Sequence, residues 1–436
     1  MPGSHADLTC KEPQVVKGQS QSGDWIGSRA MEGTMEGVQE PTSVTVQAPV
    51  HWVKNLFFNI ISIMTVLVLM CCLGELVLRV LPLGKYKSAP FRQYDPQIGE
   101  SLIPNTHVVH SRGCFEGEVS INRWGMRDRD RTLEKPSGAF RIAMIGDSAV
   151  EAVHVKPDQV VNIRMEQLLR HQGYHNIEVL SFGVGGIGTT QELLLYELKV
   201  RQFHPDLVLL MFSDNDVFNN SSTLQPKIYG IHDWYAPYYD LYPDGKLVFK
   251  PVERRYFNQL RSYIEAHSVL FYYLDRMWAQ VELPLYKWQG LPLFYATYSE
   301  SPNNEWMQAW QVTQRVLELT RDSVTADGAK LLVLPWPSAT LIDPDWRQGM
   351  IKLYGHVPSS FNPYQAQQHL QQIADSGHIP LALITPYMQA YRDQHHLHWP
   401  YFSLTCDTHF SALGHQVSAE AIVQKLQELR LLPLPE

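Results

Sequence analysis

Short apolar runs alternate with segments of helical periodicity throughout residues 84–436. Each run is the length of one buried strand, and each intervening segment repeats its apolar residues with a helical period. This alternation predicts a parallel sheet covered by helices on both faces, a three-layer α/β/α sandwich of about five strands. The expected strands are 141–146, 177–182, 206–212, 330–335 and 380–385, and the expected helices are 159–171, 190–202, 306–326, 363–375 and 411–431.

A run of eighteen residues without charge, Leu56–Leu73, precedes this region. At 1.5 Å per residue it is about 27 Å long as a helix, and ELVLRVLPL extends it beyond Gly74, so we predict one bilayer span. A buried core helix is the alternative. A cleaved signal peptide fits poorly, because the 50 residues before the run are acidic and polar. Those residues cannot bury enough apolar area to order and predict a disordered tail.

The whole-chain composition excludes several classes of protein. Hydrophobic residues make up 44% and charged residues 18%, which excludes a wholly disordered chain, and a mean hydropathy of −0.21 excludes a polytopic membrane protein. The net charge of −8, with no Lys/Arg-rich run, gives no indication of nucleic-acid binding. The predicted organisation is a tail at 1–51, a transmembrane helix with its flank at 54–83, a linker and lead-in segment at 84–139, and the α/β domain at 140–432 with an aromatic-rich insertion at about 220–305.

In a parallel α/β sheet, chemistry gathers at the carboxyl ends of the strands. The first strand ends in Gly-Asp-Ser148, the second in a glycine-rich turn containing Gly186, and the third in Ser-Asp-Asn215. Near the C-terminus, Asp407 and His409 stand two apart, so in an extended segment they project to the same side. Asp-Ser at a helix start is also the ordinary N-cap pattern, but the other two strand ends favour a site.

Together these residues supply what acyl transfer requires. Ser148 is the candidate nucleophile, His409 the base that takes its proton, and Asp407 the carboxylate that orients the imidazole. The candidate oxyanion donors are the backbone N–H groups of Ser148 and Gly186 and the side-chain amide of Asn215. This chemistry needs neither a metal nor another cofactor.

The order of these motifs resembles the SGNH (GDSL-type) hydrolase superfamily of esterases, lipases and enzymes that add or remove glycan O-acyl groups. INRWGMRD, GAFRIAMIGDS, VLSFGVGGIGTTQELLLYE and DTHFSALGHQVSAEAI extend the resemblance to the membrane-anchored bacterial branch, over about residues 105–430. It implies a flavodoxin-like fold and assigns the roles above to Ser148, Gly186, Asn215, Asp407 and His409. Many members have Asp three residues before His, whereas the spacing of two here resembles proteins of alginate O-acetylation.

Three other patterns have competing interpretations. His415 is a rival base, although its place in the last predicted helix favours packing or capping. Gly183, Gly185 and Gly188 satisfy a dinucleotide-binding pattern, but after the second strand rather than the first. The cluster at 395–398 contains three histidines without the carboxylates or cysteines of a metal site, which favours a solvated loop.

The predicted insertion is rich in aromatic residues in two places, 229–242 and 285–298. Such rings suit stacking on sugars or a membrane interface, and equally the packing of a lid onto the sandwich. The stretch 261–278 has the pattern of an amphipathic helix, for which core packing is the first expectation.

Charge and resemblance disagree about orientation. Lys54 stands alone before the span, whereas Arg79, Lys85, Lys87 and Arg92 follow it, and the positive-inside rule would keep the large domain in the cytoplasm. The resemblance implies a catalytic domain outside the cytoplasmic membrane, acting on an ester-bearing glycan or lipid. Because long domains can translocate despite charge, we expect the periplasmic side.

The five cysteines leave the redox state of the domain open. Cys10 is in the tail, and Cys71 and Cys72 are in the span, so only Cys114 and Cys406 belong to the α/β domain. Their spacing does not decide between a disulfide and two buried thiols.

Overall fold

The computed structural model of the 436-residue chain describes residues 50–80, 91–112, 115–229, 236–252, 260–261, 263–264, 267–282, 287–300, 303–405 and 408–435. The predicted tail therefore lies outside the described residues, apart from its last two positions. Cys10, Cys114, Cys406 and the predicted orienting acid Asp407 also lie outside them.

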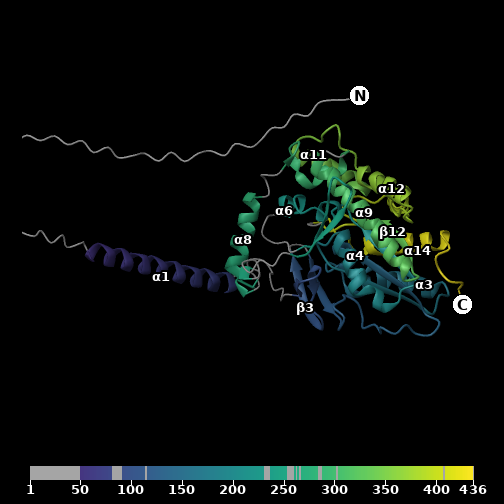
Figure 1. The fold of residues 1–436 in the computed structure, drawn as a ribbon, viewed down its shortest axis with the longest axis horizontal. Coiled ribbons are helices and arrows are strands. Elements are labelled where there is room, and N and C mark those ends of the chain that lie inside the picture. The colour runs from purple at the N-terminus through teal and green to yellow at the C-terminus, as the bar shows by residue number, and fades with distance from the viewer. Residues whose placement is uncertain are drawn as a thin grey trace, which may run out of the picture. The chain divides into compact units, whose positions relative to one another are not determined.

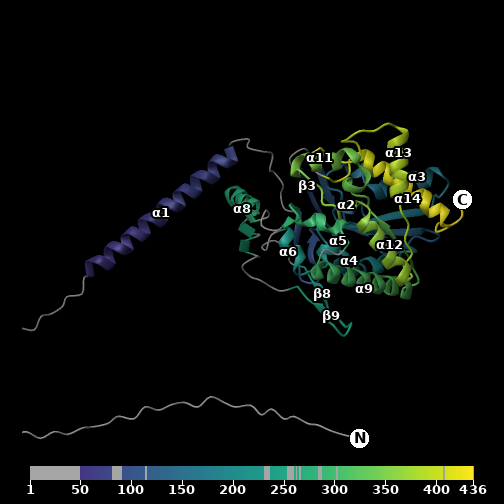
Figure 2. The same ribbon diagram turned by 90° about the horizontal axis from the view of Figure 1, so that it is seen from above.

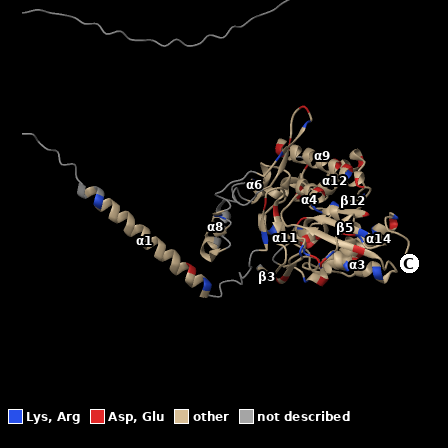
Figure 3. Ribbon diagram, turned by 60° about the horizontal axis from the view of Figure 1, so that its bottom comes forward, with Lys and Arg blue, Asp and Glu red and all other residues tan. Residues whose placement is uncertain are grey.

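The first helix, α1, runs over Val50–Val80. Among the described residues, it is the one helix long and apolar enough to cross a membrane, with a mean hydropathy of 2.6 in its most apolar part, none of which is buried. Its charged residues are Lys54 near the start and Glu75 and Arg79 near the end (Figure 3). The absence of burial argues against a core helix, so α1 has the length and composition of a single span.

Four parallel strands form the central sheet, β5 (Phe140–Gly146), β6 (Ile177–Gly183), β7 (Leu207–Phe212) and β12 (Lys330–Pro335). Their spatial order is β12-β7-β5-β6, and the alternation of apolar runs predicted all four. The fifth expected strand, 380–385, contributes one parallel bridge between Val333 and Leu381. With that segment at the edge, the order is the flavodoxin-like 2-1-3-4-5, whose switch point lies between β5 and β7.

Successive residues of each strand enter opposite cores, because strand side chains alternate. Ile142 and Met144 pack with α3 (Val161–His171), α13 (Thr385–Gln394) and α14 (Ala412–Glu428). Ala143 and Ile145 belong to the other core, with α4 (Thr189–Leu198), α9 (Asn304–Ala326) and α12 (Gln365–Gly377). The two helix layers lie on opposite sides of the sheet (Figures 1 and 2), as the alternation predicted.

The segment before the sheet, interpreted from sequence as a linker and lead-in, contains two antiparallel hairpins. Leu102, Val119 and Met126 from this region are buried in the core shared with α4 and α9. The strands are short and carry several polar residues, which is why their apolar pattern alone did not indicate them. They are β1 (Arg92–Asp95), β2 (Gly99–Leu102), β3 (Thr106–Arg112) and β4 (Phe115–Ile121).

The region between β7 and α9 is built of short elements. They are α5 (Asp216–Asn219), α6 (Leu224–Tyr229), β8 (Tyr238–Leu241), β9 (Leu247–Lys250), α8 (Val269–Glu282), β10 (Lys287–Trp288), β11 (Leu291–Pro292) and the 3-10 helix η4 (Leu293–Tyr298). The part of the amphipathic pattern from Val269 onward is helical and belongs to α8, but Leu274, Met277 and Trp278 of α8 are exposed. The expectation that this face packs in the core is therefore wrong for these three residues.

The remaining short elements lie between the strands and the longer helices. They are α2 (Ser148–Glu151), η1 (Pro157–Gln159), η2 (Val200–Phe203), α10 (Ala339–Ile342) and α11 (Pro344–Tyr354).

Candidate active site

Ser148 is the first residue of α2, directly after the carboxyl end of β5. Asp147 is the N-cap residue, and its side chain accepts a hydrogen bond from the backbone N–H of Ala149 at 2.9 Å. The turn is tight at Gly146, where a Cβ would lie 2.5 Å from the Val150 side chain. The N-cap interpretation of this motif is therefore correct, and it coexists with a serine hydroxyl presented at the sheet edge.

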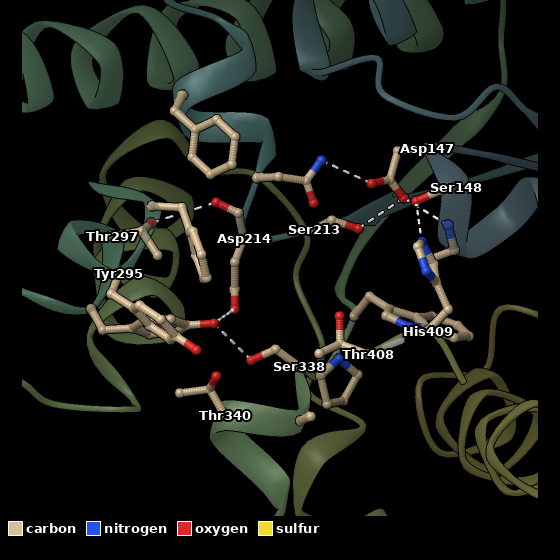
Figure 4. Close-up of a pocket in the computed structure, with 18 of the residues that line it drawn as sticks. Asp147, Ser148, Ser213, Asp214, Tyr295, Thr297, Ser338, Thr340, Thr408 and His409 are labelled. Atoms are coloured by element: carbon tan, nitrogen blue, oxygen red, sulfur yellow. Dashed lines mark hydrogen bonds between the residues drawn. The ribbon is translucent and has the colours of Figure 1, made fainter. Parts of the chain in front are cut away.

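The imidazole of His409 lies beside that hydroxyl. The distance from His409 Nε2 to Ser148 Oγ is 2.7 Å, although 261 residues separate the two in sequence (Figure 4). This is the contact a general base needs to remove the hydroxyl proton. The tertiary structure thus brings together the predicted nucleophile and the predicted base.

Both residues open into a cavity of about 210 Å³. Its walls come from the carboxyl ends of β5, β7 and β12, from η4, and from the segment before α14, which is where a doubly wound sheet binds ligands. The lining residues are Asp147, Ser148, Ala149, Ser213, Asp214, Asn215, Phe218, Phe294, Tyr295, Thr297, Tyr298, Trp336, Pro337, Ser338, Ala339, Thr340, Trp346, Thr408 and His409 (Figure 4).

Asp147 connects two strand ends beneath the nucleophile. Its buried carboxylate accepts hydrogen bonds from Ser213 Oγ at 3.0 Å and from Asn215 Nδ2 at 2.9 Å. Because a side-chain amide has two N–H donors, Asn215 keeps a second one for a ligand. The sequence indicated Asp147 only as a cap, since its other partners come from a strand 60 residues further along.

The three predicted oxyanion donors lie at different positions relative to the cavity. Ser148 and Asn215 line the cavity, whereas Gly186 is not among the described residues that do so. Gly186 adopts a positive φ of 81°, and Asn219 Nδ2 donates to its carbonyl at 3.3 Å and to that of Ile187 at 3.1 Å. Asn219 therefore holds the loop after β6, and the role of the Gly186 N–H stays a prediction.

Two glycines, the last residue of β6 and one in the loop that follows it, allow close packing between elements of the protein. A Cβ on Gly183 would lie 2.0 Å from the backbone nitrogen of Glu151 in α2, and one on Gly188 would lie 2.7 Å from Asn219 Cβ. A side chain at either position would therefore collide with α2 or with Asn219.

A second histidine, His154, lies against the candidate base. Its ring centroid is 4.9 Å from that of His409, and its Nε2 is 3.3 Å from Nε2 of His415. His415, the rival base in the sequence, is fully buried within α14, so it supports His154 instead of lining the cavity. His154 lies six residues after Ser148, and nothing in its local pattern distinguishes it from an ordinary core histidine.

Burial keeps this histidine pair uncharged. It lowers the pKa of His415 to about 3 and holds the pKa of His154 well below its ordinary value of 6.5. Arg127 adds to both effects, since its guanidinium lies behind the pair and donates to the carbonyls of Ala152 and Val155. A neutral aromatic surface thus faces one side of His409.

Two carboxyl groups are buried behind the cavity. Burial raises the pKa of Glu192 and of Asp216 well above their ordinary values, and each is close enough to other carboxylates for repulsion to raise it further. Both oxygens of Glu192 and Oδ1 of Asp216 have no hydrogen-bond partner within the described structure. The cluster favours protonated carboxyl groups in this part of the core.

The polar wall of the cavity opposite Ser148 is a hydroxyl network (Figure 4). The Tyr298 hydroxyl donates to Asp214 Oδ2 at 2.6 Å and lies 3.0 Å from Ser338 Oγ. Burial raises the pKa of Tyr298 well above 10 and also raises the pKa of Asp214. Phe294 and Tyr295 of η4 complete an aromatic side of the same cavity.

The two aromatic-rich stretches lie in different parts of the structure. The second, 285–298, reaches the cavity through η4. In the first, Tyr238 belongs to β8 and its hydroxyl donates to Gln225 Oε1, while Trp234 and Tyr235 lie outside the described residues. Tyr238 thus makes a contact within the insertion.

The histidine cluster 395–398 follows α13, and none of its three histidines is among the residues that line the cavity. His398 is exposed, with Nδ1 3.4 Å from a carboxylate oxygen of Asp345. Within the described ranges, no three histidine, cysteine or acidic residues form a group that could hold a metal ion.

The chain matches no model of a known protein family and no curated protein sequence. Solved structures with some similarity include an acetylxylan esterase from Geobacillus stearothermophilus (14% identity, 67% of this chain and 96% of that chain, TM-score 0.35). A lipase/acylhydrolase from Enterococcus faecalis (13%, 68% and 98%, TM-score 0.35) and a GDSL-like lipase from Bacteroides thetaiotaomicron (12%, 66% and 88%, TM-score 0.31) are also similar. Likenesses at these TM-scores do not decide the activity, which depends on the geometry of the site.

Proposed function

We propose that this protein is a serine esterase of SGNH type that acts through an acyl-enzyme. The observation that carries the proposal is the 2.7 Å contact between Ser148 Oγ and His409 Nε2. It occurs in a cavity at the switch point of a doubly wound sheet, where Asn215 offers an amide donor. A nucleophile, a base and an anion-stabilising donor in one cavity are the parts that ester cleavage requires.

The reaction follows from these positions. Ser148 Oγ attacks the ester carbonyl carbon while His409 Nε2 takes the hydroxyl proton. The carbonyl oxygen becomes an oxyanion, which the Ser148 N–H and the free N–H of Asn215 stabilise, with Gly186 as the third predicted donor. Collapse breaks the bond to the alcohol, and His409 returns its proton to that leaving oxygen. Asp407 is the group we expect to orient the imidazole.

The second half of the reaction regenerates the serine. His409 removes a proton from an incoming hydroxyl, which attacks the acyl carbon, and Ser148 leaves with the proton that His409 then returns. If the incoming hydroxyl belongs to water, the protein is a hydrolase. If it belongs to a sugar, the protein is an O-acyltransferase, an alternative that the two-residue spacing of Asp407 and His409 leaves as open as hydrolysis.

The cavity favours a small acyl group. Its volume of about 210 Å³ is below the roughly 300–1,000 Å³ of pockets that enclose drug-sized ligands. We therefore propose short O-acyl groups of a glycan or lipid as the substrate. With α1 as a membrane anchor, we place the catalytic domain on the periplasmic side.

Covalent labelling with a fluorophosphonate probe tests the proposal. The full chain should be labelled, peptide mass mapping should locate the phosphonate on Ser148, and Ser148→Ala should abolish it. Ser323→Ala, which removes a serine hydroxyl on α9, is the matched control and should label like the wild type. Absence of labelling in the wild type would instead support a protein that binds glycans without catalysis, and equal labelling of Ser148→Ala would exclude Ser148 as the nucleophile.

A further inference from the structure

Helix α8 presents large apolar side chains to its surroundings. Leu274, Met277 and Trp278 are 54%, 65% and 61% exposed. Their spacing of three and four residues places them on one side of the helix. Leaving three such side chains in water forgoes the stabilisation that burial of apolar surface would give. A contiguous apolar face of this kind indicates a partner surface.

The start of α8 is fixed to the last turns of α1. The carboxylate of Glu75 accepts hydrogen bonds from Ser268 Oγ at 2.9 Å, the Val269 N–H at 3.0 Å and the Leu270 N–H at 2.8 Å. This carboxylate satisfies the free N–H groups that every helix start exposes, and it complements the helix dipole. An acid from one helix thus caps the other.

Two further contacts support the same junction. Arg79 Nη2 donates to the carbonyl of His267 at 2.8 Å, and Arg79 Nε lies 2.6 Å from Glu75 Oε1. Leu270 Cδ2 would be 3.4 Å from a Cβ on Gly74, an ordinary van der Waals distance, so the start of α8 lies directly against this turn of α1. Polar and steric contacts together fix where α8 begins.

The position of Glu75 along α1 sets the depth of this junction. The charge-free run ends at Leu73, and Glu75 and Arg79 are the first charged residues after it. In a spanning helix, such residues lie at the level of the lipid headgroups. The first turn of α8 must then lie at that level too, and Trp278, only eight residues further on, is the residue type enriched there.

We propose that the exposed face of α8, formed by Leu274, Met277 and Trp278, docks on the lipid bilayer beside α1. The proposal rests on the assignment of α1 as a membrane span. A lipid surface is the partner that the Glu75 junction favours over a second copy of the chain, because the junction brings α8 to the boundary of a bilayer. Since η4 follows α8 within the same insertion, docking would keep the aromatic wall of the cavity near lipid-borne or surface-bound esters.

Site-directed fluorescence on the full chain in liposomes tests the docking. An environment-sensitive probe is placed at one position at a time, by Leu67→Cys in α1, Met277→Cys in α8 or Leu353→Cys in α11, with the native cysteines replaced by serine. Leu353 is 72% exposed and serves as the control for Met277. Quenching by nitroxide-bearing lipids and by aqueous iodide is then measured for each probe.

Docking predicts that lipid nitroxides quench the Leu67 and Met277 probes severalfold more than the Leu353 probe, with the reverse order for iodide. Adding Glu75→Gln should reduce lipid quenching at Met277 but not at Leu67. If Leu67 is quenched and Met277 behaves like Leu353, the docking is wrong while the span stands. If Leu67 is not quenched, the span and the docking both fail. Protection of Met277 from both quenchers would assign this face to a second protein chain.

Discussion

The ring of His154 packs against the ring of His409 in a tilted arrangement, at a centroid separation of 4.9 Å and an interplanar angle of 37°. On its other side, His154 contacts His415 at a centroid separation of 5.5 Å. A buried, uncharged histidine pair therefore limits the orientations that the candidate base can adopt. Acid–base catalysis is sensitive to such orientation, because a displacement of about 1 Å can cost about a hundredfold in rate.

Replacing His154 by alanine should lower kcat for ester cleavage by about ten- to a hundredfold and leave KM nearly unchanged, because the ring of His409 loses its support. Steady-state kinetics with a small activated ester measures both constants. His171→Ala, at the exposed end of α3, is the control and should keep wild-type values. A rise in KM with an unchanged kcat would show that His154 does not position the base.

Asn215 should act on the transition state. Asn215→Ala and the similarly sized Asn215→Asp both remove the amide donor, so each should reduce kcat by about 10²–10³, a loss of about 3–4 kcal/mol of transition-state stabilisation. Single-turnover acylation, followed as release of a chromogenic alcohol, reports this step directly. Wild-type acylation in both variants would exclude Asn215 from the oxyanion site.

Gly183→Ala should destabilise the fold by about 3 kcal/mol or more, because the new Cβ would meet the α2 backbone at 2.0 Å. Gly349→Ala is the matched control, since a Cβ at this position of α11 meets no atom within 4 Å. That change should be neutral or stabilise by about 0.5–1 kcal/mol. Chemical denaturation measures both. Equal stability of the two variants would contradict the close packing of α2 on β6.

The buried acids should make stability fall as pH rises. The pKa of Glu192 is raised in the folded state above its ordinary 4.5, so the stability it contributes is complete below that pH and is lost as pH rises toward the folded-state pKa. Glu192→Gln should therefore be more stable than the wild type at pH 8, by about 1–3 kcal/mol, and its advantage should vanish near pH 4. Denaturation curves across this range measure the difference. The exposed Glu134→Gln is the control, and a pH-independent effect of Glu192→Gln would contradict the raised pKa.

Local pattern determined much of the architecture. Apolar runs at four strands and helical periodicity between them fixed the parallel α/β class, because burial on both faces leaves a nearly continuous apolar signature. Where burial is one-sided or the element is short, the signature fails. The hairpins of β1–β4 were missed for that reason. The segment around Leu381, which forms a single bridge, was overestimated as a full strand.

The sequence by itself determined which chemical groups this protein has next to its predicted elements, since Gly-Asp-Ser148 and Asn215 follow strands that pattern can locate and His409 precedes the last helix. Only the tertiary structure decided which of them meet. It placed His409 2.7 Å from Ser148, gave the helix cap Asp147 a second role as acceptor for Asn215, and packed His154 against the base. The physical reason is that contacts between residues far apart in the chain depend on sheet order and helix packing, which leave no trace in the local spacing of residues.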